Sequence, residues 1–374
     1  VNLYLISATG GEARPIVSVK TTIAGYDWCD DGQRIAMIAE KPKSEEEEEL
    51  EEHGFTQKVF EEDERPLRVW IAEIGGVEEP RSLDLEGSAV QVRWSPDGER
   101  LAVAISPRPL VDDRLMYQSV HVVNVVTGEI EMTVDREGKL GRIEWSPDGG
   151  RLAMISGADL HDPSASSLLV ESAAGGSPKN LTQGFEGSVT SFAWLNDEAL
   201  LFLADVGVVT ELYRVTVGRG SLESLERFDG GVVYTAMSLA ADGHHAALIG
   251  NSSSHPGEVF VLDLEDQLPP ARVTEANPWL ARIRLAPQEV VVHTARDGLE
   301  LQGILIRPLD GSTALPAPLV MVVHGGPEGH RRDGWLDRYS SPAQVLAARG
   351  YAVFFPNYRG STGRGVEFSK LGQA

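Results

Sequence analysis

The chain has 374 residues, of which 42% are apolar and 24% are charged, and its formal net charge is −23. Such a length exceeds one ordinary compact core, so we expect two domains, or one large repeat domain with part of another. The acidic excess argues against nucleic acid as a partner, because phosphate binding needs basic surfaces. No run of about 20 apolar residues occurs, so no membrane span is predicted.

A sequence repeat dominates residues 1–275. The first half of its unit has the pattern Trp-x-x-Asp-Gly-x-x-(Ile/Leu)-Ala, in which a tight Asp-Gly turn separates two strands of alternating apolar residues. The copies, two of them weaker, begin at Trp28, Trp94, Trp145, Trp194 and Leu239. The intervals between them are 66, 51, 49 and 45 residues. A tryptophan just before the turn can cover the face of a neighbouring sheet.

The second half of the repeat is an alternating apolar stretch before a small polar turn, as in Val120 to Val126 before Thr127-Gly128. Four short strands at this spacing are typical of a β-propeller blade. Five copies of the first half and six of the second predict about five to six blades. Because the stretch Asn2 to Ile6 is a second half, we expect the chain to open within a blade, with at least half a blade upstream.

One insertion and one cysteine stand out within the repeat. Residues 45–64 hold eleven acidic side chains and one basic one, Lys58, and they account for the longest interval. We interpret them as a solvated, partly disordered loop, and the alternative is an acidic surface that steers basic peptides. The single cysteine, Cys29, excludes an intrachain disulfide. It lies in a repeat motif, so we predict that it is buried and inert.

Beyond the repeat, residues 276–318 have the pattern of a linking hairpin and loop. Two extended segments, Glu289 to Thr294 and Leu301 to Ile306, flank the turn sequence Asp297-Gly298. Residues 307–318 are rich in proline and small side chains, which predicts a loop.

An alternation of strand and helix follows the linking region. Leu319 to Val323 and Tyr351 to Phe355 are continuous apolar runs, typical of strands covered on both faces. Between them we predict a helix with Ser341 as its N-cap, Pro342 at its first position and Gly350 just past its end. A strand, a helix and a second covered strand indicate the beginning of an α/β domain.

The first motif that suggests chemistry is His324-Gly325-Gly326-Pro327, at the end of the first of these strands. In α/β-hydrolases a loop of this type donates one backbone N–H to the oxyanion of the tetrahedral intermediate. Glycine suits this task because the amide must approach the oxyanion closely with no Cβ in the way. The alternative is a glycine turn that serves only the bend of the chain.

The second motif, Asn357 to Gly363 (NYRGSTG), follows the next strand. Together with the HGGP turn, a helix that ends in Ala-Arg-Gly-Tyr and the preceding repeat, it resembles the prolyl oligopeptidase family, in particular the acylaminoacyl-peptidase branch. The resemblance extends over the whole chain, and the C-terminal part carries most of its specificity.

In that family the second glycine of the turn supplies the oxyanion N–H, and this glycine corresponds to Gly326 here. The resemblance also implies a contribution to the oxyanion site from His324, at a position where other branches have tyrosine. Support of the active site is implied for Gly325, Pro327, Tyr358 and Arg359. For Arg359 a structural role is favoured over contact with substrate.

The nucleophile of the family lies in a G-x-S-x-G turn between a strand and a helix. No such motif occurs in the 374 residues, and the spacing around Ser361, in Gly360-Ser361-Thr362-Gly363, is wrong for it. We therefore expect the Ser, Asp and His of the triad beyond Ala374, and we expect this chain by itself to be inactive.

These features predict a mainly β chain. We expect an incomplete N-terminal β-propeller at 1–275, the linking region at 276–318, and at 319–374 the first strands and helix of a truncated α/β-hydrolase domain. The resemblance implies a serine-type peptidase that hydrolyses short peptides and releases N-terminal acyl-amino acids or dipeptides, with the propeller gating access. A non-catalytic binding propeller is the alternative, and an esterase on the same fold is a third reading.

Short peptides are the expected partners, and the charge of −23 adds the hypothesis that basic peptides are favoured. No CxxC, HExxH or Walker-type motif occurs, so neither a metal nor another cofactor is predicted. His244 and His245 are adjacent on a strand and face opposite ways, which argues against a shared metal. Homo-oligomerisation stays open. No signal peptide is visible, and we expect a cytoplasmic location.

Overall fold

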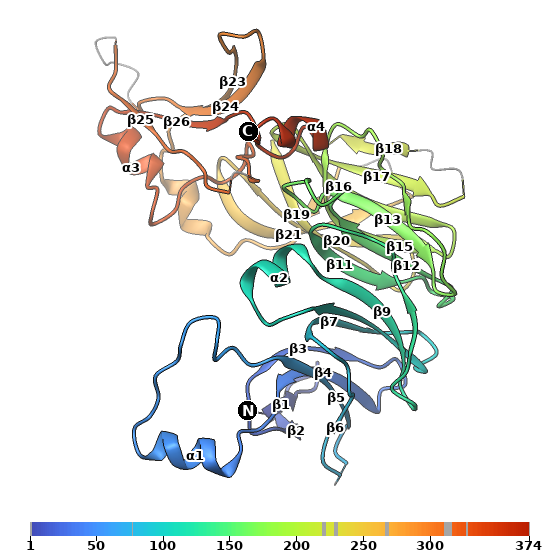
Figure 1. Ribbon diagram of the computed structural model, residues 1–374. Coiled ribbons are helices and arrows are strands. Elements are labelled where there is room, and N and C mark those ends of the chain that lie inside the picture. The colour runs from blue at the N-terminus through green and yellow to red at the C-terminus, as the bar shows by residue number, and fades with distance from the viewer. Residues whose placement is uncertain are drawn as a thin grey trace. The chain divides into compact units, whose positions relative to one another are not determined.

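The computed structural model describes residues 2–76, 78–218, 222–227, 231–265, 269–309, 316–326 and 328–373 (Figure 1). The chain divides into two compact units, Val1–Met154 with Leu169–Lys179, and Ile155–Leu168 with Asn180–Ala374. Within the described ranges, no helix has both the length and the apolar character needed to cross a membrane.

The repeat region forms a succession of small sheets whose strands follow one another in chain order. In the described residues these are one two-stranded sheet, β1–β2, and five four-stranded sheets, β3–β6, β7–β10, β11–β14, β15–β18 and β19–β22. The predicted propeller blades are confirmed by these four-stranded sheets. Cys29 is buried, as predicted.

The strands as far as β10 are β1 (Asn2–Leu5), β2 (Arg14–Ser18), β3 (Ile23–Trp28), β4 (Arg34–Glu40), β5 (Leu67–Glu73), β6 (Arg81–Ser82), β7 (Ser88–Trp94), β8 (Arg100–Ser106), β9 (Ser119–Asn124) and β10 (Ile130–Thr133). The later repeat strands are β11 (Leu140–Trp145), β12 (Arg151–Ser156), β13 (Ser167–Ser172), β14 (Lys179–Asn180), β15 (Ser188–Asn196), β16 (Ala199–Val206), β17 (Val209–Thr216), β18 (Leu222–Arg227), β19 (Val232–Leu239), β20 (His245–Ser252), β21 (His255–Asp263) and β22 (Ala271–Arg272).

In the first unit, the tryptophan that precedes a repeat turn reaches the sheet before its own. Trp94, at the end of β7, donates its indole N–H to the carbonyl oxygen of Asp27 in β3 at 3.2 Å. The guanidinium of Arg34 lies 4.8 Å from the centre of the Trp94 ring. The contact recurs one sheet later, where Trp145 donates to the carbonyl oxygen of Arg93 at 3.1 Å. The repeated tryptophan therefore joins consecutive sheets.

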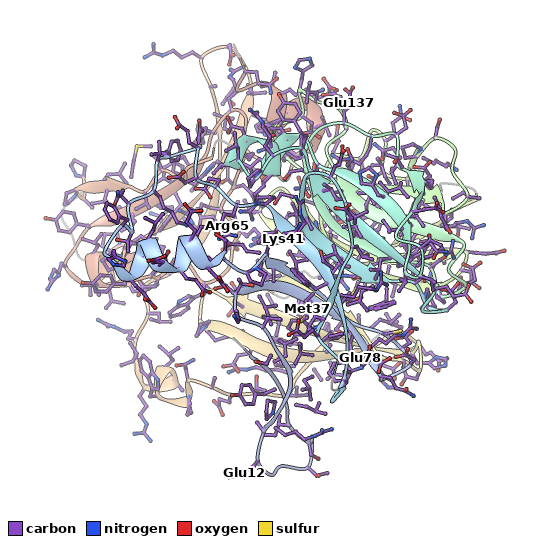
Figure 2. The ribbon with its side chains drawn as sticks, turned by 60° about the horizontal axis from the view of Figure 1, so that its bottom comes forward. Glu12, Met37, Lys41, Arg65, Glu78 and Glu137 are labelled. Carbon is purple, nitrogen blue, oxygen red and sulfur yellow. The ribbon has the colours of Figure 1, made fainter. Side chains whose placement is uncertain are left out.

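The sequence predicts a loop for residues 45–64, and this prediction is wrong for the first part, because Glu45–Glu52 form helix α1. Ser44 caps the helix: its hydroxyl accepts from the N–H of Glu47, and the Glu47 carboxylate accepts from the Ser44 N–H at 2.7 Å. Acidic side chains in the first turn also suit the positive end of the helix. Arg65 lies beside the helix, 3.5 Å from the Glu47 carboxylate (Figure 2). No helix residue is buried, so the segment is solvated as expected.

After the repeat comes a sheet of mixed direction with the order β23-β24-β26-β25. Strands β23 and β24 form the predicted hairpin, and β25 and β26 run parallel across helix α3, which confirms the α/β pattern. The elements of this region are η1 (Pro278–Arg282), β23 (Gln288–Thr294), β24 (Glu300–Ile306), β25 (Leu319–Met321), α3 (Ala343–Ala348), β26 (Ala352–Asn357) and α4 (Gly365–Lys370). The remaining helix, α2 (Val111–Met116), lies in the first unit. The domain boundaries at 275 and 318 stay predictions.

Two local expectations in this region are corrected. The N-cap of α3 is Pro342, not Ser341, because the backbone of Ser341 is bridged to Arg338 before the helix begins. Strand β25 has only three residues and is not covered on both faces: Leu319 and Met321 are 57% and 55% exposed. In the described part of the chain it pairs with β26 alone, at the end of the sheet, which leaves these side chains without a second neighbour.

Candidate active site

The glycine turn after β25 has an amide that no neighbouring group uses. Gly325 and Gly326 are exposed, and among the described residues none accepts a hydrogen bond from the N–H of Gly326. Gly326 has φ of +138°, and a Cβ added there would lie 2.5 Å from the backbone nitrogen of Glu328. The turn therefore requires glycine at 326 and leaves its N–H open to a ligand oxygen. Pro327 lies outside the described residues.

His324 joins the glycine turn to the second predicted motif. Its buried ring stacks on the ring of Tyr358, with centroids 4.3 Å apart, and its Nε2 lies 3.0 Å from the hydroxyl of Ser361. The Ser361 hydroxyl donates to the carbonyl oxygen of Tyr358 at 2.6 Å, so it accepts from His324, which places the ring proton on Nε2. The Tyr358 hydroxyl donates to the carbonyl oxygen of His324 at 2.7 Å. Burial lowers the pKa of His324, which keeps the ring neutral near pH 7.

Arg359 points away from this network. It forms an ion pair with Asp297, in the turn of the β23–β24 hairpin, and the two side chains are 40% and 54% exposed. An exposed pair of this kind contributes little to stability, because water screens its charges. Its geometry favours a structural role for Arg359, and the role itself stays a prediction.

The loop that carries Ser361 is also held by the sheet β15–β18. The N–H of Gly363 donates to the hydroxyl of Ser188 at 3.0 Å, and the carbonyl oxygen of Gly363 accepts from the N–H of Gly207 at 2.6 Å. Gly363 has φ of +87°, and a Cβ there would lie 3.0 Å from the carbonyl oxygen of Gly207. The close approach of the two backbones thus depends on glycine.

A buried polar cluster beside these loops was missed by the sequence analysis. Asp205, in β16, is only 3% exposed, and both its carboxylate oxygens lie 3.3 Å from Nη1 of Arg332. Nε2 of His330 lies 3.4 Å from the same carboxylate, and its Nδ1 lies 2.8 Å from the hydroxyl of Thr362. The one sequence signal is an aspartate that ends an apolar run in a repeat strand. Its partners are 125 or more residues away, since 330 − 205 = 125.

Comparison with known proteins finds sequences and folds that are similar to this chain. A sequence model of the prolyl oligopeptidase family matches residues 337–374. The chain is 23% identical over 348 residues to dipeptidyl-peptidase 5 of Aspergillus fumigatus, which covers 91% of this chain and 40% of that protein. It is 28% identical over 209 residues to the acylamino-acid-releasing enzyme of Sus scrofa, which covers 51% of this chain and 27% of that protein. Residues 337–374 of this chain thus match the prolyl oligopeptidase family.

The fold agrees with that of a solved structure. Acylaminoacyl peptidase of Pyrococcus horikoshii matches with a TM-score of 0.72 and 17% identity, over 98% of this chain and 56% of that one. The predicted fold class, a propeller followed by the beginning of an α/β-hydrolase domain, is confirmed by this match. The chain spans less than half the length of the two curated relatives above.

Replacement of Ser361 tests the buried network of His324, Tyr358 and Ser361. Ser361→Ala is expected to lower the free energy of unfolding by about 1–3 kcal/mol, because buried His324 and the Tyr358 carbonyl each lose a partner. Urea denaturation measures the change. Ser340→Ala, at an exposed serine of the same unit, is the control and should stay within about 0.5 kcal/mol of the wild type. A Ser361→Ala protein as stable as the control would contradict the network.

The cluster of Asp205 and His330 predicts an unusual dependence of stability on pH. Burial and the Arg332 guanidinium lower the pKa of His330 to about 3, and burial raises the pKa of Asp205 to about 6. The contribution of His330 to the free energy of unfolding is present above pH 6.5 and is lost as pH falls toward 3. The Asp205 contribution is present below pH 3.8 and is lost as pH rises through 6.

Between about pH 4 and 6 the two contributions oppose each other, so the wild type should change little in stability there. His330→Gln removes one of them, and the variant should gain roughly 3 kcal/mol on acidification from pH 6.5 to 4, from the two-unit shift of Asp205. Urea denaturation at half-unit steps of pH measures both profiles. Parallel profiles for the two proteins would show that the cluster does not titrate in this way.

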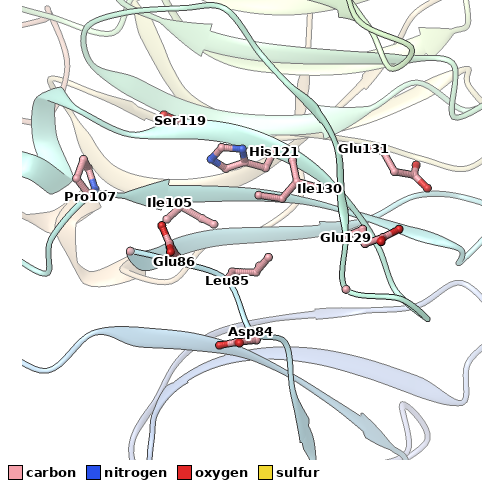
Figure 3. Close-up of a pocket in the computed structure, with 12 residues that line it drawn as sticks. Asp84, Leu85, Glu86, Ile105, Pro107, Ser119, His121, Glu129, Ile130 and Glu131 are labelled. Carbon is pink, nitrogen blue, oxygen red and sulfur yellow. The ribbon is translucent and has the colours of Figure 1, made fainter.

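A groove of about 970 Å³ lies in the first unit, which contains none of these motifs (Figure 3). Segment 84–87 and strands β8, β9 and β10 line it. Its carboxylates are those of Asp84, Glu86, Glu129 and Glu131. His121 also lines it, with Nδ1 2.8 Å from the hydroxyl of Thr133, and burial lowers the pKa of this histidine. Across the described ranges, no group of three or more His, Cys, Asp or Glu side chains is placed to hold a metal ion.

Proposed function

We propose that the protein is a serine-type peptidase that hydrolyses short peptides. The observation that carries this proposal is the exposed N–H of Gly326, which has no acceptor among the described residues and sits on a turn that only glycine can adopt. A backbone N–H in this state is suited to hydrogen-bond an oxyanion, because no competing partner must be displaced. The match of residues 337–374 to the prolyl oligopeptidase family supports the same activity.

In the proposed reaction a serine hydroxyl attacks the scissile carbonyl carbon, and its proton passes to a histidine held by an aspartate. The carbonyl oxygen becomes the oxyanion and accepts from the N–H of Gly326. The histidine then protonates the leaving amine as the C–N bond breaks, and water hydrolyses the acyl-enzyme. His324 was predicted to contribute to the oxyanion site. Because its ring N–H already points to Ser361, we assign it the task of holding the turn.

We further propose that the nucleophile, acid and base come from sequence outside residues 1–374, since these lack a G-x-S-x-G turn. A fluorophosphonate probe tests this placement. It should label a protein that carries these residues together with such a turn, and it should not label residues 1–374 alone. Labelling of the chain 1–374 at any serine would overturn the placement.

The names of the relatives suggest the products, namely N-terminal acyl-amino acids or dipeptides. Chromogenic anilides of an acetylated amino acid and of a free dipeptide distinguish these two products, when they are assayed with a protein that carries residues 1–374 together with a G-x-S-x-G turn. The preferred substrate should have the higher kcat/KM, and hydrolysis of neither would refute the peptidase proposal. Gating by the propeller would appear as a fall in kcat/KM with peptide length. A cytoplasmic location and homo-oligomerisation remain predictions.

A non-catalytic binding role for the propeller is the second candidate. The groove in Figure 3 is the feature that favours it, because its volume of about 970 Å³ could hold part of a partner chain. Absence of fluorophosphonate labelling in a protein with an intact G-x-S-x-G turn would make this candidate the better one.

A further inference from the structure

A polar pocket of about 240 Å³ lies next to the loop that follows the glycine turn. One wall consists of Thr235 and Asn251, from the sheet β19–β22. The opposite wall is the loop after Gly329, with the guanidinium groups of Arg331, Arg332 and Arg338. All of these residues belong to the second unit. Three arginines thus gather at one pocket of a chain that has 56 acidic and only 33 basic residues.

Only one of these arginines has an acidic partner. Arg332 is paired with buried Asp205. Neither Arg331 nor Arg338 forms an ion pair with any residue that the structure describes, and Nε of Arg331 is buried with no hydrogen-bond acceptor there. Burial and the charge of Arg338 both lower the pKa of Arg331. Two adjacent cations without a counter-charge destabilise the pocket, and a bound anion would relieve this repulsion.

Hydrogen bonds hold the backbone of this loop, so the main-chain positions that carry the two arginines are fixed before any ligand arrives. Asn357 accepts from the N–H of Arg331 at 2.6 Å and donates to its carbonyl oxygen at 2.8 Å. Asn251 accepts from the N–H of Trp335 at 2.7 Å, and Gln288 donates to the Asp333 carboxylate at 2.7 Å. A prearranged loop loses little conformational freedom on binding, which favours affinity.

We propose that Arg331 and Arg338 bind a carboxylate of the peptide substrate in this pocket. The inference rests on the proposed peptidase function, because the loop that forms the pocket continues directly from Gly326. Arginine suits the task, since its planar fork can donate two parallel hydrogen bonds to a carboxylate. The carboxylate can be the C-terminus of a short peptide or an acidic side chain. The local charge therefore favours acidic substrates, the opposite of what the net charge of −23 suggests.

Isothermal titration of the chain with three blocked peptides tests the proposal. The probes are N-acetyl-Ala-Ala-Ala as the free acid, the same peptide as the amide, and N-acetyl-Ala-Glu-Ala amide. The free acid should bind at least about tenfold more tightly than the neutral amide, because a charge-assisted bond is lost in the amide. Binding of the Glu peptide amide as tightly as the free acid identifies a side chain as an equally good source of the carboxylate.

Arg331→Gln and Arg338→Gln should each weaken binding of the free acid by about tenfold and leave the neutral amide unchanged. Arg338 is exposed, so its variant should fold normally. The control is Arg282→Gln, at an exposed arginine of η1 that lies outside the pocket and should bind as the wild type does. Equal binding of acid and amide, or unchanged binding by both pocket variants, would overturn the proposal.

Inorganic phosphate separates a peptide from a free anion as the ligand. Phosphate binding that depends on Arg331 and Arg338, without binding of either carboxylate peptide, would overturn the substrate assignment. Hydrolysis of a neutral anilide is measured in parallel on a protein that carries residues 1–374 together with a G-x-S-x-G turn, and it tests the peptidase proposal alone. Carboxylate binding without any hydrolysis would refute the peptidase proposal but not the carboxylate site. Hydrolysis without a preference for carboxylate peptides would refute the carboxylate site but not the peptidase proposal.

Discussion

In a protein with the proposed peptidase activity, Gly326→Ala is expected to lower kcat by about 100-fold or more. The added Cβ would lie 2.5 Å from the backbone nitrogen of Glu328, and φ of +138° is unfavourable for alanine. The turn must therefore shift, and the N–H that should meet the oxyanion moves with it. Because the oxyanion forms in the transition state, kcat should fall far more than KM rises. Steady-state kinetics on a short anilide substrate measures both.

Gly325→Ala is the matched control, one residue earlier in the same turn. A Cβ at Gly325 would meet no atom within 4 Å, and its backbone is not in the left-handed region. The variant should keep kcat within a few-fold of the wild type. Equal losses in the two variants would mean that the turn serves only the bend of the chain, and a normal kcat for Gly326→Ala would remove this amide from the mechanism.

Asp205→Ala is expected to lower the free energy of unfolding by about 1–3 kcal/mol, because the guanidinium of Arg332, whose side chain is 31% exposed, loses its charged hydrogen-bond partner. Both carboxylate oxygens lie 3.3 Å from that group, and the aspartate side chain is almost fully buried. Since Asp205 belongs to the repeat and Arg332 follows the glycine turn, the loss should also loosen the turn. Urea denaturation at pH 7 measures the stability.

Asp297→Ala removes an exposed aspartate that is ion-paired near the site, and it provides the comparison. Asp297 is 54% exposed in its pair with Arg359, so its loss should leave the stability close to that of the wild type. The difference between the two variants isolates the effect of burial. If Asp205→Ala were as mild as Asp297→Ala, water must reach the cluster and screen its charges.

The fold could be predicted wherever the chain repeats one local pattern. The turn motif at Trp94 and Trp145 gave both the spacing and the strand pairing, because a tight turn fixes the register of the strands beside it. The pattern failed where local and tertiary effects compete. Helix α1 forms from a run of glutamates because Ser44 caps it. From the sequence, we gave more weight to the high charge of the run than to this local cap. Strand β25 is apolar but exposed, because burial depends on neighbouring elements that the sequence of the strand itself does not specify.

The site was predictable only in part for the same reason. Gly326 lies in the motif His324-Gly325-Gly326-Pro327, which is typical of an oxyanion loop, so the sequence alone could suggest its role. The link between His324 and Ser361 spans 37 residues and arises when two strand ends meet in the folded sheet. Asp205 lies still farther from its partners, in a repeat strand that looked purely structural. Its burial beside Arg332 could be seen only after the sheets were assembled.

The tryptophan contact between consecutive sheets has a consequence for how such chains evolve. Trp94 and Trp145 each donate to a backbone carbonyl, and a carbonyl is present whatever side chain the preceding sheet carries there. The arginines above the two rings, Arg34 and Arg100, occupy the same position of the motif. This contact cannot distinguish one blade from another. Gene duplication or deletion of a whole blade would therefore leave this contact intact.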